Sequence, residues 1–272
     1  MLELRWLKEG GPQDLVIVGA GGQAAESLWV AEAMNQSATA AGRPALWNIL
    51  GCCVYNPDLY PPEILSYRVL GTPRDVARDH KGGGLRFICG IGDNRIREQE
   101  AGVAESFGWR AVTLIHPSCQ VAPNAVIGPG TYLAACSVVC TNARVGAHVL
   151  INNHVSVGHD STMGDFSQAC PGSRISGKCA VGRPSFLGTN ATLLPGVTLG
   201  DRAVLGANSV AKHNVEADVT AVGVGSSAKM AFSFSHVPSR LPSLTNTISY
   251  ERFRFSRVAD KRRWNSSILL TS

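Results

Sequence analysis

The sequence predicts an α/β domain followed by a parallel β-solenoid, and two observations support this fold class. A strand, a glycine turn and a helix begin at residue 14, as in the first unit of a nucleotide-binding βαβ domain. From residue 121 to residue 210, an apolar residue recurs every six positions without a slip. A period of six fits neither a helix nor strand alternation, but it fits a triangular coil that returns every eighteen residues.

The N-terminal domain is expected to span residues 14–115. Its first strand is the run DLVIV, which leads into the turn Gly19-Ala20-Gly21-Gly22 and a helix over residues 23–34. Peptide N–H groups at such a turn and at the start of the helix can bind phosphate oxygens. The other parallel strands are expected at residues 46–54, 86–91 and 111–115, with a second helix over residues 93–108. No acid ends the second strand, so an NAD site is not expected.

The solenoid is expected to form five coils from fifteen hexads. The apolar residue of each hexad should point inward, and the small or β-branched residue four places later should lie near the corner. Glycine follows the apolar residue in eight of the fifteen hexads. These glycines are predicted to allow the backbone angles that a corner needs.

The hexads resemble those of the hexapeptide-repeat acyltransferases, with IGPG, VGAH, VGHD, LGDR and LGAN among the matching segments. This resemblance implies a left-handed parallel β-helix, over residues 116–230, behind a small Rossmann-like domain. It also implies a homotrimer with acetyl-CoA sites between neighbouring β-helices.

Residues 14–230 together resemble the sialic-acid-type O-acetyltransferases and the UDP-4-amino-sugar N-acetyltransferases of bacteria. The matching motifs include VIVGAGG, GIGDNRIR, LIHPSCQVAPNAVIG and VSVGHD. The resemblance implies that the N-terminal domain binds a nucleotide-sugar acceptor through Gly21, Gly22, Gln23 and Gly92. The chain departs from the family in having Gln23 for a histidine, and Val54 and Tyr55 for a pair of acids.

His159 and Asp160 are the candidate catalytic residues. A neighbouring carboxylate can orient an imidazole and raise its basicity, which suits a general base. VGHD stands where the family keeps its general base, and Gly177 lies eighteen residues later, where the family holds the oxyanion with a peptide N–H. The resemblance also implies acetyl-CoA contacts at Gln168, Thr189 and Ala207.

The expected function is therefore transfer of an acetyl group from acetyl-CoA to an amine or hydroxyl of a nucleotide-linked or free sugar. One alternative is a trimer that binds nucleotide sugars or is purely structural, without turnover. Another is a zinc enzyme like the γ-class carbonic anhydrases, because His154 and His159 have the H-x4-H spacing. Its third ligand would fall at Ser118, which is no metal-binding side chain, so no metal is expected.

Composition limits the remaining classes. Residues 1–230 contain eighteen basic and eighteen acidic residues, so nucleic-acid binding by this part has no electrostatic support. The eight cysteines are predicted to be free thiols, and without a signal peptide or transmembrane run a cytoplasmic location is expected. Residues 231–272 hold seven basic and two acidic residues, and are predicted to be a disordered tail or a segment that contacts anionic surfaces.

Overall fold

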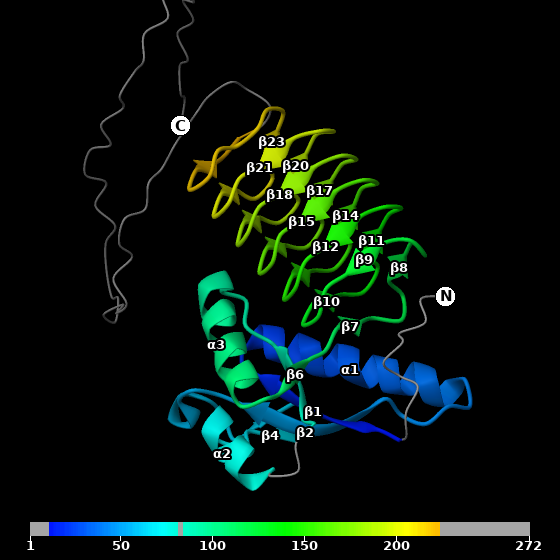
Figure 1. The fold of residues 1–272 in the computed structure, drawn as a ribbon, viewed down its shortest axis with the longest axis vertical. Helices are drawn as coiled ribbons and strands as arrows, with labels where there is room; N and C mark the ends of the chain where they lie inside the picture. Colours follow the sequence, from blue (N-terminus) through cyan, green and yellow to red (C-terminus); the bar gives the residue numbers. More distant parts are fainter. Residues whose placement is uncertain (1–10, 81–83, 224–272) are drawn as a thin grey trace, which may run out of the picture. The chain divides into compact units, whose positions relative to one another are not determined.

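The computed structural model describes residues 11–80 and 84–223, in which a small parallel sheet with helices is joined to a parallel β-solenoid (Figure 1). The predicted tail, residues 231–272, and the last residues of the predicted β-helix domain lie outside the described residues. The sheet and the solenoid belong to one compact unit. None of the helices in the described ranges has the length and apolar character that a membrane crossing requires.

The sheet has four parallel strands in the order β2, β1, β5, β6. These strands are β1 Gln13–Val18, β2 Trp47–Cys53, β5 Arg86–Cys89 and β6 Arg110–Ala111. Residues 15–18 of the inner strand β1 are 0–1% exposed. Burial on both faces explains why this strand is a continuous apolar run and does not alternate with polar residues.

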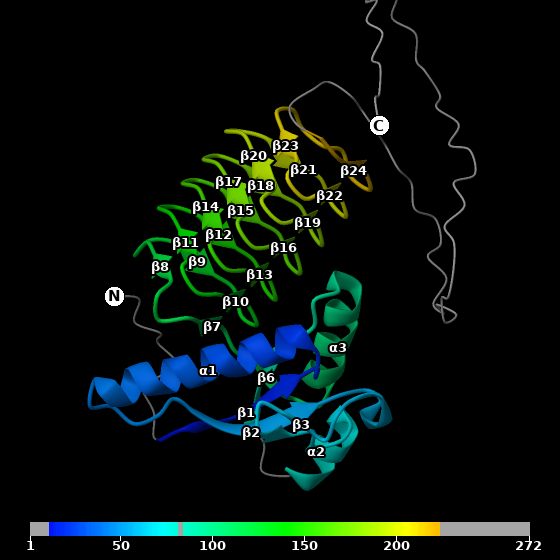
Figure 2. The ribbon, with the colours of Figure 1, turned by 180° about the vertical axis from the view of Figure 1, so that it is seen from behind.

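Helices cover both faces of the sheet. They are α1 Gly22–Ala40, α2 Pro73–Asp79 and α3 Asn94–Ser106, with a short 3₁₀ helix at Pro57–Leu59 and a hairpin of β3 Glu63–Ile64 and β4 Tyr67–Arg68. Leu15 and Ile17 point into a core shared with α1 and with residues of the solenoid, whereas Val16 and Val18 point into a core shared with α2 and α3. Figures 1 and 2 both show α1 running between the sheet and the first coils.

The solenoid has three parallel sheets of two-residue strands, one sheet on each side of the coil. The first sheet contains β7 Leu114–Ile115, β10 Tyr132–Leu133, β13 Leu150–Ile151, β16 Gln168–Ala169, β19 Phe186–Leu187, β22 Val204–Leu205 and β24 Thr220–Ala221. The second sheet contains β8 Gln120–Val121, β11 Val138–Val139, β14 Ser156–Val157, β17 Arg174–Ile175, β20 Thr192–Leu193 and β23 Val210–Ala211. The third sheet contains β9 Val126–Ile127, β12 Arg144–Val145, β15 Thr162–Met163, β18 Ala180–Val181 and β21 Thr198–Leu199.

The predicted left-handed parallel β-helix is confirmed, and it has about six turns. Partners on successive coils are eighteen residues apart, as Val139 and Val157 are. The solenoid is longer than the five coils predicted, because β7 precedes them and β24 follows them.

The prediction that residues 111–115 form the fourth strand of the small sheet is wrong. This run is divided between two sheets: β6 ends at Ala111, and β7 pairs with β10 of the solenoid. Ile115 lies six residues before Val121 and is therefore in phase with the hexads. Leu114 and Ile115 are therefore part of the first sheet of the solenoid.

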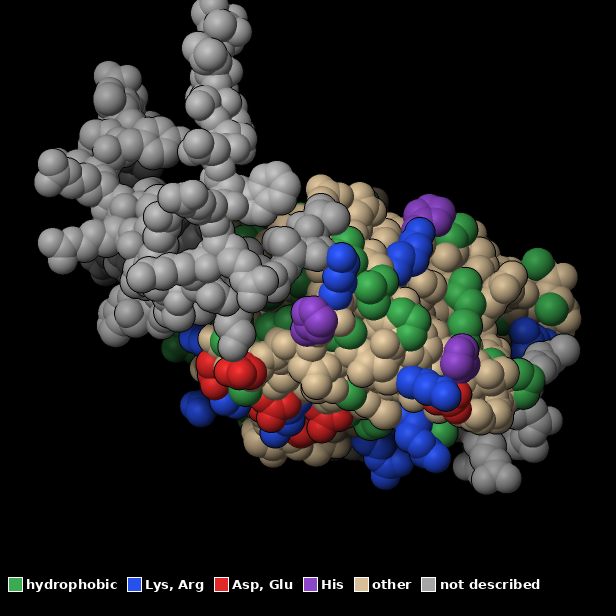
Figure 3. All heavy atoms as spheres, turned by 90° about the horizontal axis from the view of Figure 1, so that it is seen from above, with side chains coloured by type: hydrophobic (Ala, Val, Ile, Leu, Met, Phe, Trp, Pro, Cys, Tyr) green, Lys and Arg blue, Asp and Glu red, His purple; other side chains and the backbone are tan. Residues whose placement is uncertain are grey.

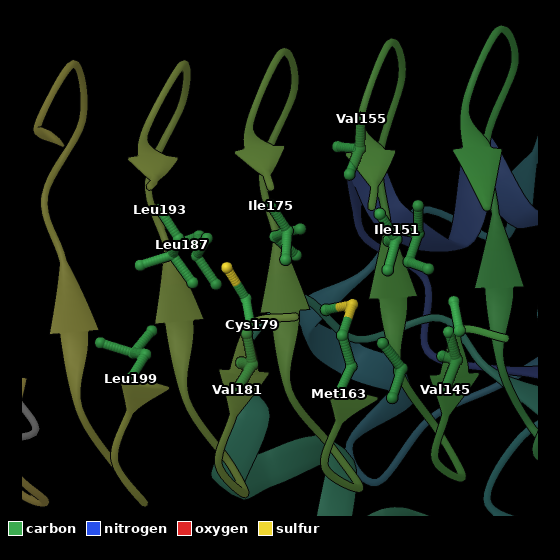
Figure 4. Packing of buried hydrophobic residues seen from close by; sticks show 14 of the residues in the cluster. Val145, Ile151, Val155, Met163, Ile175, Cys179, Val181, Leu187, Leu193 and Leu199 are labelled. Atoms are coloured by element: carbon green, nitrogen blue, oxygen red, sulfur yellow. The ribbon is translucent and has the colours of Figure 1, made fainter. Parts of the chain in front are cut away.

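The predicted inward residues form the core of the solenoid, and Figure 4 shows them from close by. Ile151, Leu187 and Leu199 are 0% exposed. Each aliphatic side chain buried in this way contributes about 1.5–3 kcal/mol relative to an exposed one. This contribution is repeated on every side of every coil. It therefore stabilises a structure whose strands are only two residues long.

The glycines that follow the apolar residues do not serve the purpose predicted for them. The left-handed backbone angles occur two residues after these glycines, at positions mostly occupied by other residues, such as His148 (φ 54°) and Asp160 (φ 58°). A Cβ on Gly158 would lie 2.5 Å from the Ser176 carbonyl carbon of the next coil. Glycine at this position is therefore required by the close approach of successive coils.

Arg97 of α3 ties the N-terminal domain to the solenoid. Its side chain is 0% exposed, and Nε donates to the His148 carbonyl (3.0 Å) while Nη2 donates to the Phe166 carbonyl (2.7 Å). Nη1 donates to the carbonyls of Ile91 (2.9 Å) and Gly92 (3.3 Å). Burial lowers the pKa of Arg97 to about 10, so it remains charged at neutral pH. One guanidinium thus holds the loop after β5 against two coils.

His148 lies outside the inward positions of the hexads, and yet it is buried. It is 3% exposed, and its ring stacks on Phe166 with centroids 4.9 Å apart. Nε2 lies 3.3 Å from a carboxylate oxygen of Glu105 on α3. The hexad period predicts the direction in which the side chain leaves the coil. It does not predict that a helix covers this side chain.

The surface charges are mixed. On the face seen in Figure 3, acidic and basic side chains lie next to one another, which agrees with the balanced charge of residues 1–230. All eight cysteines are free thiols, as predicted. Cys52, Cys53, Cys89 and Cys179 are buried and pack as small apolar residues.

Candidate active site

His159 and Asp160 form a hydrogen-bonded pair at the corner between β14 and β15. His159 Nδ1 lies 2.8 Å from Asp160 Oδ2, and Asn142 of the preceding coil donates to Asp160 Oδ1 (2.9 Å). The His159 side chain is 58% exposed. The hydrogen bonds from His159 and Asn142 lower the pKa of Asp160, so this carboxylate is ionised at neutral pH. Nε2 of the imidazole has no hydrogen-bond partner in the described part of the chain, so it can take a proton from a bound molecule.

Gly177 lies against the ring of His159, one coil further along. A Cβ on Gly177 would be 2.6 Å from Cε1 of the imidazole. The Gly177 N–H donates no hydrogen bond within residues 11–80 and 84–223. At an equivalent place on another corner, Ala147 N–H is bound by the carboxylate of Asp165 from the next coil (2.8 Å), whereas the residue above Gly177 is Pro195. The arrangement places an unused N–H donor beside the imidazole.

Thr189 and Ala207 lie on a different corner, after β19 and β22. Both are exposed and they stack on adjacent coils, since the N–H of Asn208 donates to the Thr189 carbonyl (2.8 Å). In the described part of the chain, neither Thr189 N–H nor Ala207 N–H donates a hydrogen bond. This corner can therefore bind the polar groups of an extended ligand through its main chain.

Gln168 is not at the corner of Thr189 and Ala207. It lies on the outer side of β16 and is 7% exposed. Nε2 contacts Cys170 Sγ (3.6 Å), and Oε1 is buried with no hydrogen-bond partner among the described residues.

The four predicted substrate-binding residues come together at one pocket of about 500 Å³ at the carboxyl ends of the strands. They are Gly21, Gly22, Gln23 and Gly92. Nε2 of Gln23 is buried and has no hydrogen-bond partner in the described ranges. His159 is not among the residues that line the pocket. Within one chain, the pocket and the His159–Asp160 pair are therefore separate.

Two residues of this pocket were not singled out from the sequence. Tyr60 follows the 3₁₀ helix and lies at the pocket together with Tyr55, which is 82% exposed. Glu100 of α3 also lines the pocket and is only 8% exposed. Burial raises the pKa of Glu100 above its usual value. A charged residue on the buried side of an otherwise amphipathic helix is the signal that could have indicated it.

The residues for a zinc site are not gathered in the described part of the chain. No group of three or more His, Cys, Asp and Glu side chains there is arranged to hold a metal ion. The expected third position, Ser118, makes a hydrogen bond with His116 Nδ1 (2.8 Å).

Known proteins resemble this chain over both of its parts. A family model described as the hexapeptide repeat of succinyl-transferase matches residues 180–210. The solved structure of PerB from Caulobacter crescentus, in complex with CoA and GDP-perosamine, is 30% identical, with a TM-score of 0.67, and the match covers 79% of this chain and 94% of PerB. The acetyltransferase domain of PglB from Neisseria gonorrhoeae, in complex with acetyl coenzyme A, is 27% identical, with a TM-score of 0.67, covering 78% of this chain and 97% of that domain.

A curated relative gives the same indication over a shorter length. GDP-perosamine N-acetyltransferase of Escherichia coli O157:H7 is 25% identical over 111 residues, which cover 41% of this chain and 50% of that protein. The match therefore spans half the length of this relative.

The fold and these similarities define a hexapeptide-repeat acyltransferase. Within that class, the chain belongs to the family of sugar N-acetyltransferases, because PerB is 30% identical to it and is matched over 94% of its length.

Proposed function

We propose that this protein transfers the acetyl group of acetyl-CoA to the amine of a nucleotide-linked amino sugar. The observation that carries the proposal is the pairing of His159 with Asp160 at 2.8 Å beneath an unused Gly177 N–H. The nature of the substrates is supported by the relatives, because PerB is in complex with CoA and GDP-perosamine and the PglB domain is in complex with acetyl coenzyme A. A cytoplasmic location is in keeping with acetyl-CoA as the co-substrate.

The mechanism uses His159 as the general base. The amine nitrogen attacks the thioester carbon of acetyl-CoA, and His159 Nε2 accepts a proton from that nitrogen. Asp160 stabilises the resulting imidazolium through the bond to Nδ1. The Gly177 N–H donates to the oxyanion of the tetrahedral intermediate, which collapses to the amide and releases CoA as the thiolate. No bond between enzyme and acetyl group is needed.

In this proposal, a complete active site forms only between two copies of this chain. His159 lies on the solenoid and does not line the nucleotide pocket of its own chain. In a homotrimer, the pocket of one subunit would face the His159 corner of its neighbour. Acetyl-CoA would lie along the corner of Thr189 and Ala207. A role of Gln168 requires the cofactor to reach a side chain that is 7% exposed in the single chain.

The proposal is tested by measuring CoA release with 4-amino sugars linked to GDP, UDP, dTDP and CMP. We expect turnover with at least one carrier, and a trimer in light scattering at micromolar concentration. Binding of acetyl-CoA without turnover on any amine or hydroxyl acceptor would instead support the binding protein considered above. A monomer that is fully active would refute the shared site.

A further inference from the structure

The acidic side chain in the pocket of the N-terminal domain comes from helix α3 and not from the end of the second strand. The second strand of this chain is followed by Val54 and Tyr55, neither of which is an acid. Both line the pocket, and so does Glu100 of α3. The electrostatic neighbours of Glu100 include Cys53, the last residue of β2. A carboxylate therefore lies near the end of the second strand although the strand itself supplies none.

This carboxylate has no partner of its own. Glu100 is 8% exposed, and its carboxylate makes no hydrogen bond or ion pair with any residue in the ranges 11–80 and 84–223. Burial without a partner raises its pKa. The Glu100 oxygens are not among the fully buried side-chain atoms that lack a partner in the described residues, so they reach the pocket. There they can accept hydrogen bonds from a ligand with suitable donors.

Gln23 gives a second, independent indication of a ligand in the same pocket. Its Nε2 is buried without a hydrogen-bond partner among the described residues. Gln23 stands in the first turn of α1, next to Gly21 and Gly22, where a Cβ would meet nothing within 4 Å. The pocket thus offers open space and a free donor at the helix start, and a free acceptor at Glu100.

We propose that Glu100 is the residue that recognises the nucleoside, by accepting hydrogen bonds from two adjacent donors. A carboxylate has two acceptor oxygens, so it matches a pair of neighbouring N–H or O–H groups. Two parts of a nucleotide have such a pair, namely the N1–H and N2–H edge of guanine and the 2′ and 3′ hydroxyls of ribose. This inference rests on the proposed function, because it assumes a nucleotide-linked acceptor.

The base edge has a consequence for specificity. Uracil and thymine have one N–H between two carbonyl oxygens, and a carboxylate facing that edge would meet acceptors on both sides. A Glu100 that faces the base therefore favours guanine over these pyrimidines. A Glu100 that faces the ribose favours no base, but it distinguishes ribose from 2′-deoxyribose.

The test is a calorimetric titration of GDP, 2′-deoxy-GDP, UDP and dTDP into the full-length protein and into Glu100→Gln. This variant keeps the size of the side chain but replaces one acceptor oxygen with a donor. We expect GDP to bind about 10- to 100-fold more weakly to the variant, the loss expected for a charge-assisted hydrogen bond. Glu63→Gln is the matched control, because Glu63 is exposed on β3 and does not line the pocket.

Comparison of the four ligands distinguishes recognition of the base from recognition of the ribose. If the base is recognised, GDP and 2′-deoxy-GDP lose affinity and UDP does not. If the ribose is recognised, GDP and UDP lose affinity equally, and 2′-deoxy-GDP and dTDP bind the original protein weakly. Unchanged affinity of Glu100→Gln for all four ligands would overturn the inference.

The melting temperature without ligand distinguishes recognition from a structural role. Removal of an unpaired buried charge should leave the melting temperature of Glu100→Gln equal to or above that of the original protein. A lower melting temperature with unchanged GDP affinity would show that Glu100 only supports the fold, which also refutes the inference. Acetyl-CoA binding is measured in parallel, so that a failure of the nucleoside site is not mistaken for a failure of the acetyltransferase site.

Discussion

Nε of Arg97 donates a hydrogen bond to the main-chain carbonyl of His148 over 3.0 Å, although 51 residues separate the two in the chain. The same guanidinium binds the carbonyls of Ile91 and Gly92, which line the pocket at the carboxyl ends of the strands. All of its acceptors are neutral oxygens of carbonyl or amide groups. The position of the pocket relative to the solenoid therefore depends on a buried charge that has no carboxylate partner among residues 11–80 and 84–223.

Replacement of Arg97 by alanine should destabilise the protein by about 3–5 kcal/mol, because several buried carbonyls lose their donor at once. For a domain of this size, that corresponds to a fall in melting temperature of roughly 10 °C or more. Differential scanning calorimetry measures it. Arg95→Ala on the same helix is the control, since Arg95 is exposed, and an equal effect of both variants would contradict the role given to Arg97.

His159→Ala should lower acetyl transfer by on the order of 10²–10⁴, the usual contribution of a positioned general base. Because the side chain is 58% exposed, the melting temperature should not change. Steady-state rates of CoA release provide the measurement. His154→Ala, another exposed histidine on the solenoid, should retain near-normal turnover. Near-normal turnover of His159→Ala would refute the assignment of the base.

Asp160→Asn should reduce the rate less than loss of the base itself. The substitution removes a charge-assisted hydrogen bond worth about 1.5–3 kcal/mol, which corresponds to roughly 10- to 100-fold in rate. The KM for acetyl-CoA should be unchanged, since the thioester is not expected to contact this carboxylate. A change confined to KM would show that Asp160 acts in binding and not through His159.

Gly177→Ala should impair catalysis by displacing the imidazole. The added Cβ would lie 2.6 Å from Cε1 of His159, so the ring or the coil must shift. A misplacement of about 1 Å can cost about 10²-fold in rate. Gly102→Ala is the matched control, because a Cβ on Gly102 meets nothing within 4 Å. Full activity of Gly177→Ala would show that the contact is not maintained during the reaction.

Truncation after Met230 should leave trimer formation and acetyl transfer within about threefold of the full chain, because every residue given a role here lies before it. The removed segment lies outside the described residues. Size-exclusion chromatography with light scattering and the transfer assay provide the comparison. Insolubility or loss of activity under conditions where the full chain works would show that the domain boundary at residue 230 is misplaced.

The period of six was sufficient to predict the solenoid, because each side of a coil repeats the same local geometry. Leu187 and Leu199 could be assigned to the core from their phase alone. The function of the glycines could not be predicted in this way. Gly158 is required by Ser176, which lies one coil of eighteen residues later, and the period does not give the close approach of their two backbones.

The adjacency of His159 and Asp160 was visible in the sequence, and their hydrogen bond follows from that adjacency. The stacking of Gly177 on the imidazole followed from the eighteen-residue coil. Glu100 was missed because it belongs to a helix whose contact with the end of β2 depends on how α3 packs on the sheet.

The sequence by itself determined the repeating features of this protein: the coil, its inward residues and the pair at its corner. All of these depend on neighbours at one residue or at a constant spacing of six or eighteen. The tertiary structure alone decided which surfaces meet. The burial of His148 under α3 and the six oxygens around the Arg97 guanidinium come from segments with no common period. Their contacts depend on the packing of one part against the other, which no local pattern encodes.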